Sequence, residues 1–214
     1  MGNNLFNVTF ESNKLYNPNS DGFDFVMSNG GDIKLSSGSV AYQGSYGCEI
    51  TPLQNYRCAG AERIPVTTRF RQAFYLHPNA ITIPTTRTIC ISRNYYSDEQ
   101  NGLYWIRLNN IAGVYGIECN ADDNSSSQAY GSGTFNLDNQ TNWNLIESEW
   151  YSDNASGFFK LWINGTLKWN RTLVNGNLRV VFPCIGAMRQ QYAISGTLYI
   201  DYWRANNDGS LIGA

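Results

Sequence analysis

The sequence has few of the features that several functional classes require. Only 15 of its 214 residues are Lys or Arg, and the net charge is −2 at pH 7. Because these cations form no basic stripe, nucleic acid is not an expected partner. No apolar run approaches the ~18 residues of a membrane-spanning helix. The opening residues, MGNNLFNVTFE, also lack the cationic and apolar parts of a signal peptide. We therefore expect no nucleic-acid partner and no membrane span.

The sequence is also poor in metal-binding and redox signatures. Its five cysteines are odd in number and contain no CxxC pair, and His77 is the only histidine, so a zinc site is not expected. Three cysteines lie in apolar, strand-like runs: Cys90, Cys119 and Cys184. A free thiol in such a run behaves as a small hydrophobic side chain. Cys48 and Cys58 could form a disulfide, but mostly free thiols are favoured.

Aromatic residues are abundant at 14%, and the remainder is rich in Asn, Ser, Thr and Gly. This composition is typical of strands joined by many turns. Val66 to Leu76 alternates with period two, which indicates a half-buried strand. We expect short strands throughout, including one over Ser39 to Tyr42, and a loop over Asp122 to Gly133. Since no helical period stands out, the sequence predicts a single all-β antiparallel sandwich or barrel over residues 1–214.

The clearest local signal is the stretch FFKLWINGTLKWNR, from Phe158 to Arg171. Asn164-Gly165 stands between two apolar runs and predicts a two-residue hairpin turn, in which both residues need positive φ.

Several segments resemble the concanavalin A-like lectin/glucanase superfamily, especially its LamG-type and carbohydrate-binding branches. NVTFE and GTLYIDYWRA resemble the paired terminal strands of such domains, and YQGSYGCEI resembles an early Gly-rich turn that leads into a buried strand. RFRQAFYL, NLIESEWY and GFFKLWINGTL follow in the expected order. The resemblance implies a two-sheet jelly roll with its first and last strands adjacent, often used for glycans and often carrying calcium. Because the superfamily also contains glycosidases and lyases, catalysis is judged separately.

The resemblance also implies a structural calcium ion near the joined termini. Its candidate ligands are the carboxylates of Glu11 and Asp201, together with loop carbonyls and with Asp21 or Asp24 from the loop between Asn17 and Asp24. Many relatives have an Asp-Asp pair where this sequence has Asp201-Tyr202, so one carboxylate is missing. In the alternative interpretation, Glu11 and Asp201 accept hydrogen bonds from the neighbouring backbone or from Arg204.

The sequence argues against catalysis. Glycoside hydrolysis needs two carboxylates that flank the bond, and the closest match, Glu147-Ser148-Glu149, has no third acid. We interpret Glu147 and Glu149 as the solvated face of an outer strand. His77 precedes Pro78 and Asn79, which indicates a turn after a strand rather than a general base.

The hairpin suggests a binding platform. A regular register would place six side chains on one face: Phe158, Lys160, Trp162, Leu167, Trp169 and Arg171. Trp162 and Trp169 could stack on sugar rings, with Lys160 and Arg171 beside them. Alternatively, these rings cover the second side of the sandwich or an oligomer interface. A second candidate platform consists of Tyr95, Tyr96 and Tyr104.

From these patterns we predict a non-catalytic binding or attachment module whose partner is a polysaccharide or surface glycan. A virion or extracellular surface is the expected location. Two alternatives stay open. One is a purely structural virion decoration, fibre or surface-layer protein that packs against capsid or other surface-assembly proteins. The other is a polysaccharide-degrading enzyme of the same fold.

Overall fold

The computed structural model describes residues 4–17, 21–28, 31–53, 58–95, 102–121, 130–173, 178–188 and 192–212. The strands in chain order are β1 (Asn4–Val8), β2 (Phe25–Ser28), β3 (Asp32–Ser37), β4 (Tyr46–Thr51), β5 (Cys58–Ala61), β6 (Arg69–His77), β7 (Arg87–Tyr95), β8 (Gly102–Ile111), β9 (Val114–Ala121), β10 (Tyr130–Asn136), β11 (Asn144–Tyr151), β12 (Gly157–Ile163), β13 (Thr166–Leu173), β14 (Phe182–Ala187) and β15 (Leu198–Asn206). The one helix among the described residues is the 3₁₀ turn η1 (Gly38–Val40). The all-β prediction is therefore confirmed for the part of the chain that the structure describes.

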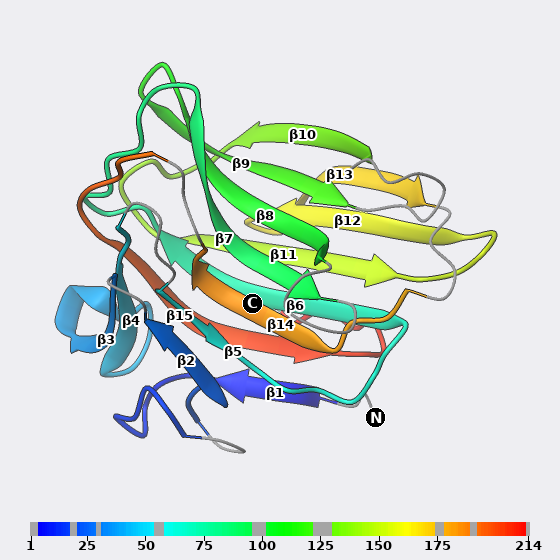
Figure 1. Cartoon of the computed structure of the whole chain (residues 1–214), viewed down its shortest axis with the longest axis horizontal. Coiled ribbons are helices and arrows are strands. Elements are labelled where there is room, and N and C mark those ends of the chain that lie inside the picture. Colours follow the sequence, from blue (N-terminus) through cyan, green and yellow to red (C-terminus); the bar gives the residue numbers. More distant parts are fainter. Residues whose placement is uncertain are drawn as a thin grey trace.

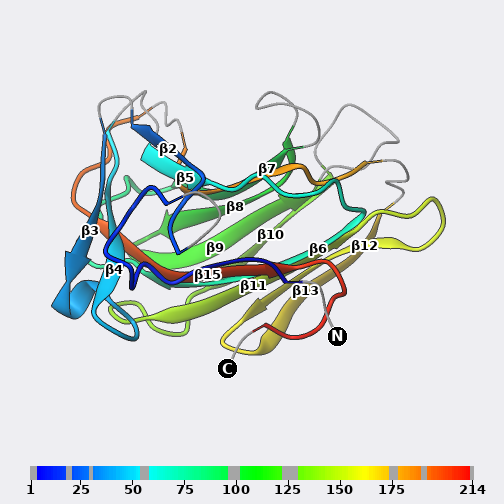
Figure 2. The same ribbon diagram turned by 90° about the horizontal axis from the view of Figure 1, so that it is seen from below.

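The strands form two antiparallel sheets. One has eight strands in the order β13-β12-β11-β6-β15-β4-β3, with β1 added on β15, and the other has seven in the order β10-β9-β8-β7-β14-β5-β2. In Figure 1 the seven-stranded sheet lies in front of the eight-stranded one, and Figure 2 shows the two layers from below. Phe6 to Val8 of β1 pair antiparallel with Ala205 to Trp203 of β15, which confirms that the first and last strands are neighbours.

The core lies between the sheets and contains large aromatic residues. Trp150, Trp203, Phe70 and Phe159 are fully buried. They are inward-facing because alternate residues of a strand point to opposite faces of the sheet. Burial of this much apolar surface is the main term that stabilises the sandwich.

A hydrogen-bond network crosses the core and joins the two sheets. The Gln72 side-chain amide of β6 donates to Ser92 of β7 over 3.0 Å and to Tyr104 of β8 over 3.2 Å. It also donates to Ser148 over 3.2 Å, and its carbonyl accepts a 3.0 Å bond from the Trp203 indole. These polar groups are buried, so the bonds offset the cost of removing them from water and fix the two sheets relative to each other.

The structure corrects three sequence predictions of secondary structure. The predicted strand over Ser39 to Tyr42 is wrong, because Gly38 at φ +75° leads instead into the 3₁₀ turn. Strand β5 was missed, since all four of its small residues are buried and show no alternation. The loop predicted over Asp122 to Gly133 is wrong at its end, where β10 begins at Tyr130, while residues 122–129 lie outside the described part.

Candidate functional site

A row of cross-strand neighbours runs over the outer face of the seven-stranded sheet. The Cα partners connect six strands in turn, from β2 to β9, through Phe25, Ala61, Cys184, Arg93, Trp105 and Asn120. We call these six residues the outer row. Their chain neighbours, such as Val26, Ile185 and Ile106, pack into the core instead. With five interstrand spacings, the outer row is about 24 Å long, which is enough for several sugar rings.

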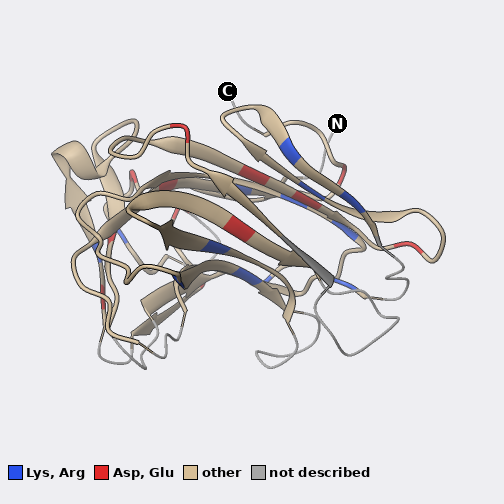
Figure 3. Ribbon diagram, turned by 90° about the horizontal axis from the view of Figure 1, so that it is seen from above, with Lys and Arg blue, Asp and Glu red and all other residues tan. Residues whose placement is uncertain are grey.

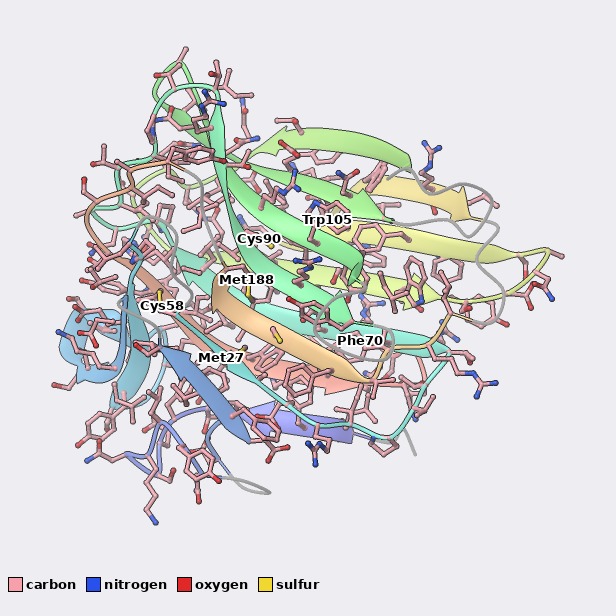
Figure 4. The ribbon with its side chains drawn as sticks, viewed as in Figure 1. Met27, Cys58, Phe70, Cys90, Trp105 and Met188 are labelled. Carbon is pink, nitrogen blue, oxygen red and sulfur yellow. The ribbon has the colours of Figure 1, made fainter. Side chains whose placement is uncertain are left out.

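An apolar cluster separate from the core lies beneath the outer row. Its buried members are Ala59, Ala61, Tyr95, Cys184 and Met188, and Met27, Cys90 and Phe182 pack against them. Figure 4 shows Met27, Cys90, Trp105 and Met188 on the near side of the seven-stranded sheet. The sandwich core does not explain an apolar cluster on an outer face, because that face points away from the second sheet. The five buried members are at most 4% exposed, so the cluster supports the side chains of the outer face and is not itself an exposed patch.

The row begins with the aromatic ring of Phe25, continues with the small side chains of Ala61 and Cys184, and then reaches the wide side chains of Arg93 and Trp105 before Asn120. Ala61 and Cys184 lie between the Phe25 ring on one side and Trp105 on the other. Phe25 is 36% exposed, and its ring contacts that of Phe182 at a centroid distance of 5.5 Å. Ala61 and Cys184 are fully buried, so the accessible part of the row consists of its wide side chains.

Three arginines lie over rings on this face. The guanidinium carbon of Arg93 is 4.8 Å from the centroid of Tyr95, and that of Arg107 is 5.2 Å from that of Trp105. The guanidinium carbon of Arg63 is 5.0 Å from the centroid of the Phe25 ring. Cation–π contacts of this kind hold the guanidinium groups flat against the aromatic surface.

Two nitrogen donors of the outer row have no acceptor among the described residues. They are the Arg93 Nε and the Trp105 Nε1, and both are buried. Gly102 makes room for the first, because a Cβ there would come within 2.7 Å of the Arg93 Nε. A buried donor without an acceptor costs about 1–3 kcal/mol. A ligand acceptor would reach these two atoms only after a neighbouring side chain moved, since both are closed off from the surface.

The predicted platform on the β12–β13 hairpin is only partly present. Asn164 (φ 49°) and Gly165 (φ 75°) form the expected turn. A bulge after Trp162 then shifts the register, so that Trp169 pairs with Leu161 and Arg171 with Phe159. The prediction that Trp169 and Arg171 share a face with Trp162 is wrong. The extra residue of the bulge moves both to the inward side, where the Trp169 ring contacts Phe159 at 5.5 Å.

The remaining platform residues, Lys160 and Trp162, lie on the outer face of the eight-stranded sheet. The Arg71 guanidinium covers one side of the Trp162 ring at 4.3 Å, and the Lys160 ammonium lies 4.3 Å from the Phe158 ring centroid. Trp162 is only half-buried, so part of its ring stays accessible.

The interpretation of Glu147 and Glu149 as a solvated face is wrong. Each residue is only 3% exposed. Arg71 forms ion pairs with Glu147 at 3.3 Å and with Glu149 at 3.4 Å, and Arg69 adds a 2.6 Å pair to Glu149. These carboxylates are buried because opposite charges on the neighbouring strand β6 compensate them. The pairing makes them parts of an ion-pair network.

The second predicted platform is also wrong. Tyr104 points into the core, is fully buried, and stacks on Trp150 at a centroid distance of 5.8 Å. Burial raises the pKa of its hydroxyl. Tyr95 does lie on the outer face, but it is only 2% exposed beneath Arg93. Neither ring can stack on a ligand in this arrangement. Tyr96 lies outside the described residues.

The four candidate calcium ligands divide into two places. Three of them accept hydrogen bonds from backbone amides. Glu11 accepts from the amides of Ser45 and Tyr46, and Asp201 accepts from those of Tyr42, Gln43 and Tyr202. Asp21 accepts from the amides of Thr9, Phe10 and Ser12. Asp24 faces other partners, because it accepts from the Arg63 amide and its own amide donates to Glu62. A single ion held by all four does not fit this arrangement. Among the described residues, no group of three or more His, Cys, Asp or Glu side chains is arranged to hold a metal. Calcium at the remaining three carboxylates stays a prediction.

No family model and no curated protein matches the sequence. Several solved structures match nearly its full length. The chain is similar to the cellulose-induced protein Cip1 (13% identity, TM-score 0.66, 98% of this chain and 99% of that one). It is similar to domain 4 of AbnA, an extracellular arabinanase from Geobacillus stearothermophilus, in complex with arabinotriose (17%, 0.56, 96% and 93%). The alginate lyase Aly36B is a further match (14%, 0.60, 97% and 98%).

Together, the two-sheet topology and these similarities define the class of fold. The protein has a concanavalin A-like jelly-roll fold, as the sequence motifs predicted. Proteins of similar structure include a carbohydrate-binding domain and an enzyme that acts on a polysaccharide. In the described part of the chain, no helix is long and apolar enough to cross a membrane.

Proposed function

We propose that the protein is a non-catalytic module that binds a glycan chain along the outer row. The observation that carries the proposal is the combination, in one row, of the exposed Phe25 ring, the half-buried Trp105 ring and the half-buried Arg93. Sugar rings present apolar C–H faces that can pack on Trp105 and Phe25, and their oxygens are acceptors for the N–H groups.

The residue content of this sheet supports binding rather than hydrolysis. Glu118 is the single Asp or Glu within its seven strands, and none of the strands contains histidine. Glu118 is held by Arg107 in a 2.9 Å ion pair. Glycoside hydrolysis needs a second carboxylate across the scissile bond. The nearest carboxyl pair, Glu62 and Asp24, lies just beyond the β5 and β2 end of the row.

The experiment compares two half-buried tryptophans, one on each sheet. Binding of soluble polysaccharides is measured by affinity electrophoresis and calorimetry for the wild type, Trp105→Ala and Trp162→Ala. We expect Trp105→Ala to weaken binding by about tenfold or more, equivalent to ~1.4 kcal/mol. Trp162→Ala should keep wild-type affinity. The reverse result would move the site to the eight-stranded sheet and contradict the proposal.

The same mixtures serve to test for catalysis. New reducing ends report hydrolysis, and absorbance of an unsaturated product reports elimination. We expect neither to form with the wild type. Turnover that is lost in Glu62→Gln would show that the Glu62–Asp24 pair acts as an acid or base, and the non-catalytic part of the proposal would then be wrong.

A further inference from the structure

We infer that the outer row selects an acidic polysaccharide, with Arg93 as the side chain that contacts its carboxylate or sulfate groups. This inference rests on the proposed function and adds the chemical class of the glycan.

The charges on this face are unequal. Within the strands, Arg93 and Arg107 lie along the row with Glu118 as the one carboxylate. Just beyond the β5 end, Arg63 lies beside the carboxyl groups of Asp24 and Glu62, so that end has charges of both signs. Since Glu118 pairs with Arg107 at 2.9 Å, its charge is already compensated. Among the described residues, no carboxylate lies within ion-pair distance of Arg93. The middle of the row is therefore locally positive, although the whole protein has a net charge of −2.

The eight-stranded sheet contains both paired and unpaired arginines, since Arg171 and Arg204 form no ion pair among the described residues. Arg69 and Arg71, on the outer face of β6, both form ion pairs with glutamates of β11. Charged residues are sparse along the ribbons of both sheets (Figure 3), so each pairing matters for the local charge. Arg93 differs from Arg69 and Arg71 because its guanidinium lies on the Tyr95 ring and beside Trp105, with no ion pair among the described residues. The missing acceptor at its Nε does not set it apart, because the Nε atoms of Arg71, Arg171 and Arg204 also have none.

The hydrogen-bonding character of the row also favours an anion. A neutral sugar hydroxyl both donates and accepts, so it is best satisfied by a mixture of protein groups. The centre of the row offers donors, namely the Arg93 guanidinium and the Trp105 indole, whereas Asn120 is its one side-chain amide. Carboxylate and sulfate groups only accept, and the guanidinium fork fits two of their oxygens at once. The neighbouring rings can then hold the apolar face of the same sugar.

The experiment uses one polysaccharide backbone in two charge states. Polygalacturonate and its fully methyl-esterified form are titrated into the wild type, with alginate as a second acidic ligand. We expect the acidic forms to bind about tenfold more tightly than the ester, because the ester keeps the sugar rings but loses the carboxylate charge. Affinity for the acid should fall as NaCl rises from about 50 mM to about 500 mM, since salt screens charges at the surface.

Arg93→Gln is the decisive variant, and Arg204→Gln is its matched control. Arg204 also lies over a tyrosine, with its guanidinium 5.5 Å from the Tyr202 ring, but it belongs to the other sheet. We expect Arg93→Gln to abolish the preference for the acid while weak binding of the ester persists, and Arg204→Gln to behave as the wild type.

The possible failures can be told apart. Equal or tighter binding of the ester, or a preference for acid that survives in Arg93→Gln, overturns the inference but leaves the proposed function standing. Equal binding of single-stranded oligo(dT) indicates a general polyanion surface, which also overturns the inference. Absence of binding to every acidic and neutral polysaccharide tested overturns the proposed function itself.

Discussion

At the scale of single residues, the least expected feature is a buried carboxyl group near the joined ends of the sandwich. Asp201 is fully buried, and burial raises its pKa from 3.8 to about 7, with the charge of Glu11 contributing in the same direction. The unfolded chain releases this proton near pH 4, whereas the folded protein keeps it until about pH 7. The contribution of Asp201 to stability is therefore fully present below about pH 4 and is lost as pH rises to about 7.

The substitution Asp201→Asn tests this linkage. We expect the fall in the free energy of unfolding between pH 4.5 and pH 7.5 to be smaller in the variant than in the wild type, because the variant has no proton to release. Urea unfolding at both pH values measures it. Glu62, whose pKa burial and Asp24 raise to about 8, keeps its own contribution in both proteins. An unchanged pH dependence in the variant would mean that Asp201 ionises normally.

The same measurement examines the calcium prediction. A bound cation favours the charged form of Asp201 and would lower its pKa. If calcium binds at Glu11, Asp21 and Asp201, millimolar Ca²⁺ should reduce the pH dependence and raise the melting temperature, and a chelator should reverse both.

At the scale of elements, the β12–β13 turn predicts how substitutions at Gly165 change the free energy of unfolding. Gly165 has φ +75°, and an added Cβ would meet nothing within 4 Å, so a larger residue there suffers only from the backbone conformation. We expect Gly165→Val to lower the free energy of unfolding by about 1 kcal/mol or more. Gly165→Asn should cost less, because Asn tolerates the left-handed region. Equal melting temperatures for all three proteins would contradict the turn geometry.

The strands and turns also show which structural features could be predicted from the sequence and which could not. The Asn-Gly turn and the inward face of β6 could be predicted from local patterns, whereas the pairing of the terminal strands was predicted from the resemblance to concanavalin A-like domains. The bulge after Trp162 could not, because one extra residue reverses the faces of all later residues and leaves no mark in composition. The outer row was missed although β8 contained its signal. There, Trp105 and Arg107 alternate with the buried Tyr104, Ile106 and Leu108.

The burial of Glu147 and Glu149 also could not be predicted from local sequence patterns. Glu147 and Glu149 have the local pattern of a solvated strand face, and only the pairing of β11 with β6 brings Arg71 opposite them. Partners about 80 residues apart in the chain are set by sheet order, which one sequence without its topology does not reveal.

At the scale of the whole molecule, the sandwich depends on packing rather than on cross-links. None of the five cysteines, all of which lie in the described part of the chain, forms a disulfide. Burial raises the pKa of Cys58 to about 12 and that of Cys90 to about 11. We expect the same melting temperature with and without reductant. A thiol reagent should titrate five thiols in denaturant but react slowly with the native protein, with half-buried Cys90 first. A melting temperature that falls in reductant would instead indicate a Cys48–Cys58 disulfide.

The pairing of β1 with β15 has a practical consequence. Asn4 lies opposite Asn206, and Figures 2 and 3 show both ends of the chain on the same side of the molecule. A short linker could therefore join the ends, and the chain could be reopened at the Asn164–Gly165 turn as a circular permutant. The same proximity would allow the sandwich to be inserted as a domain into a surface loop of another protein. The outer row would stay accessible, because it lies on the sheet that contains neither end.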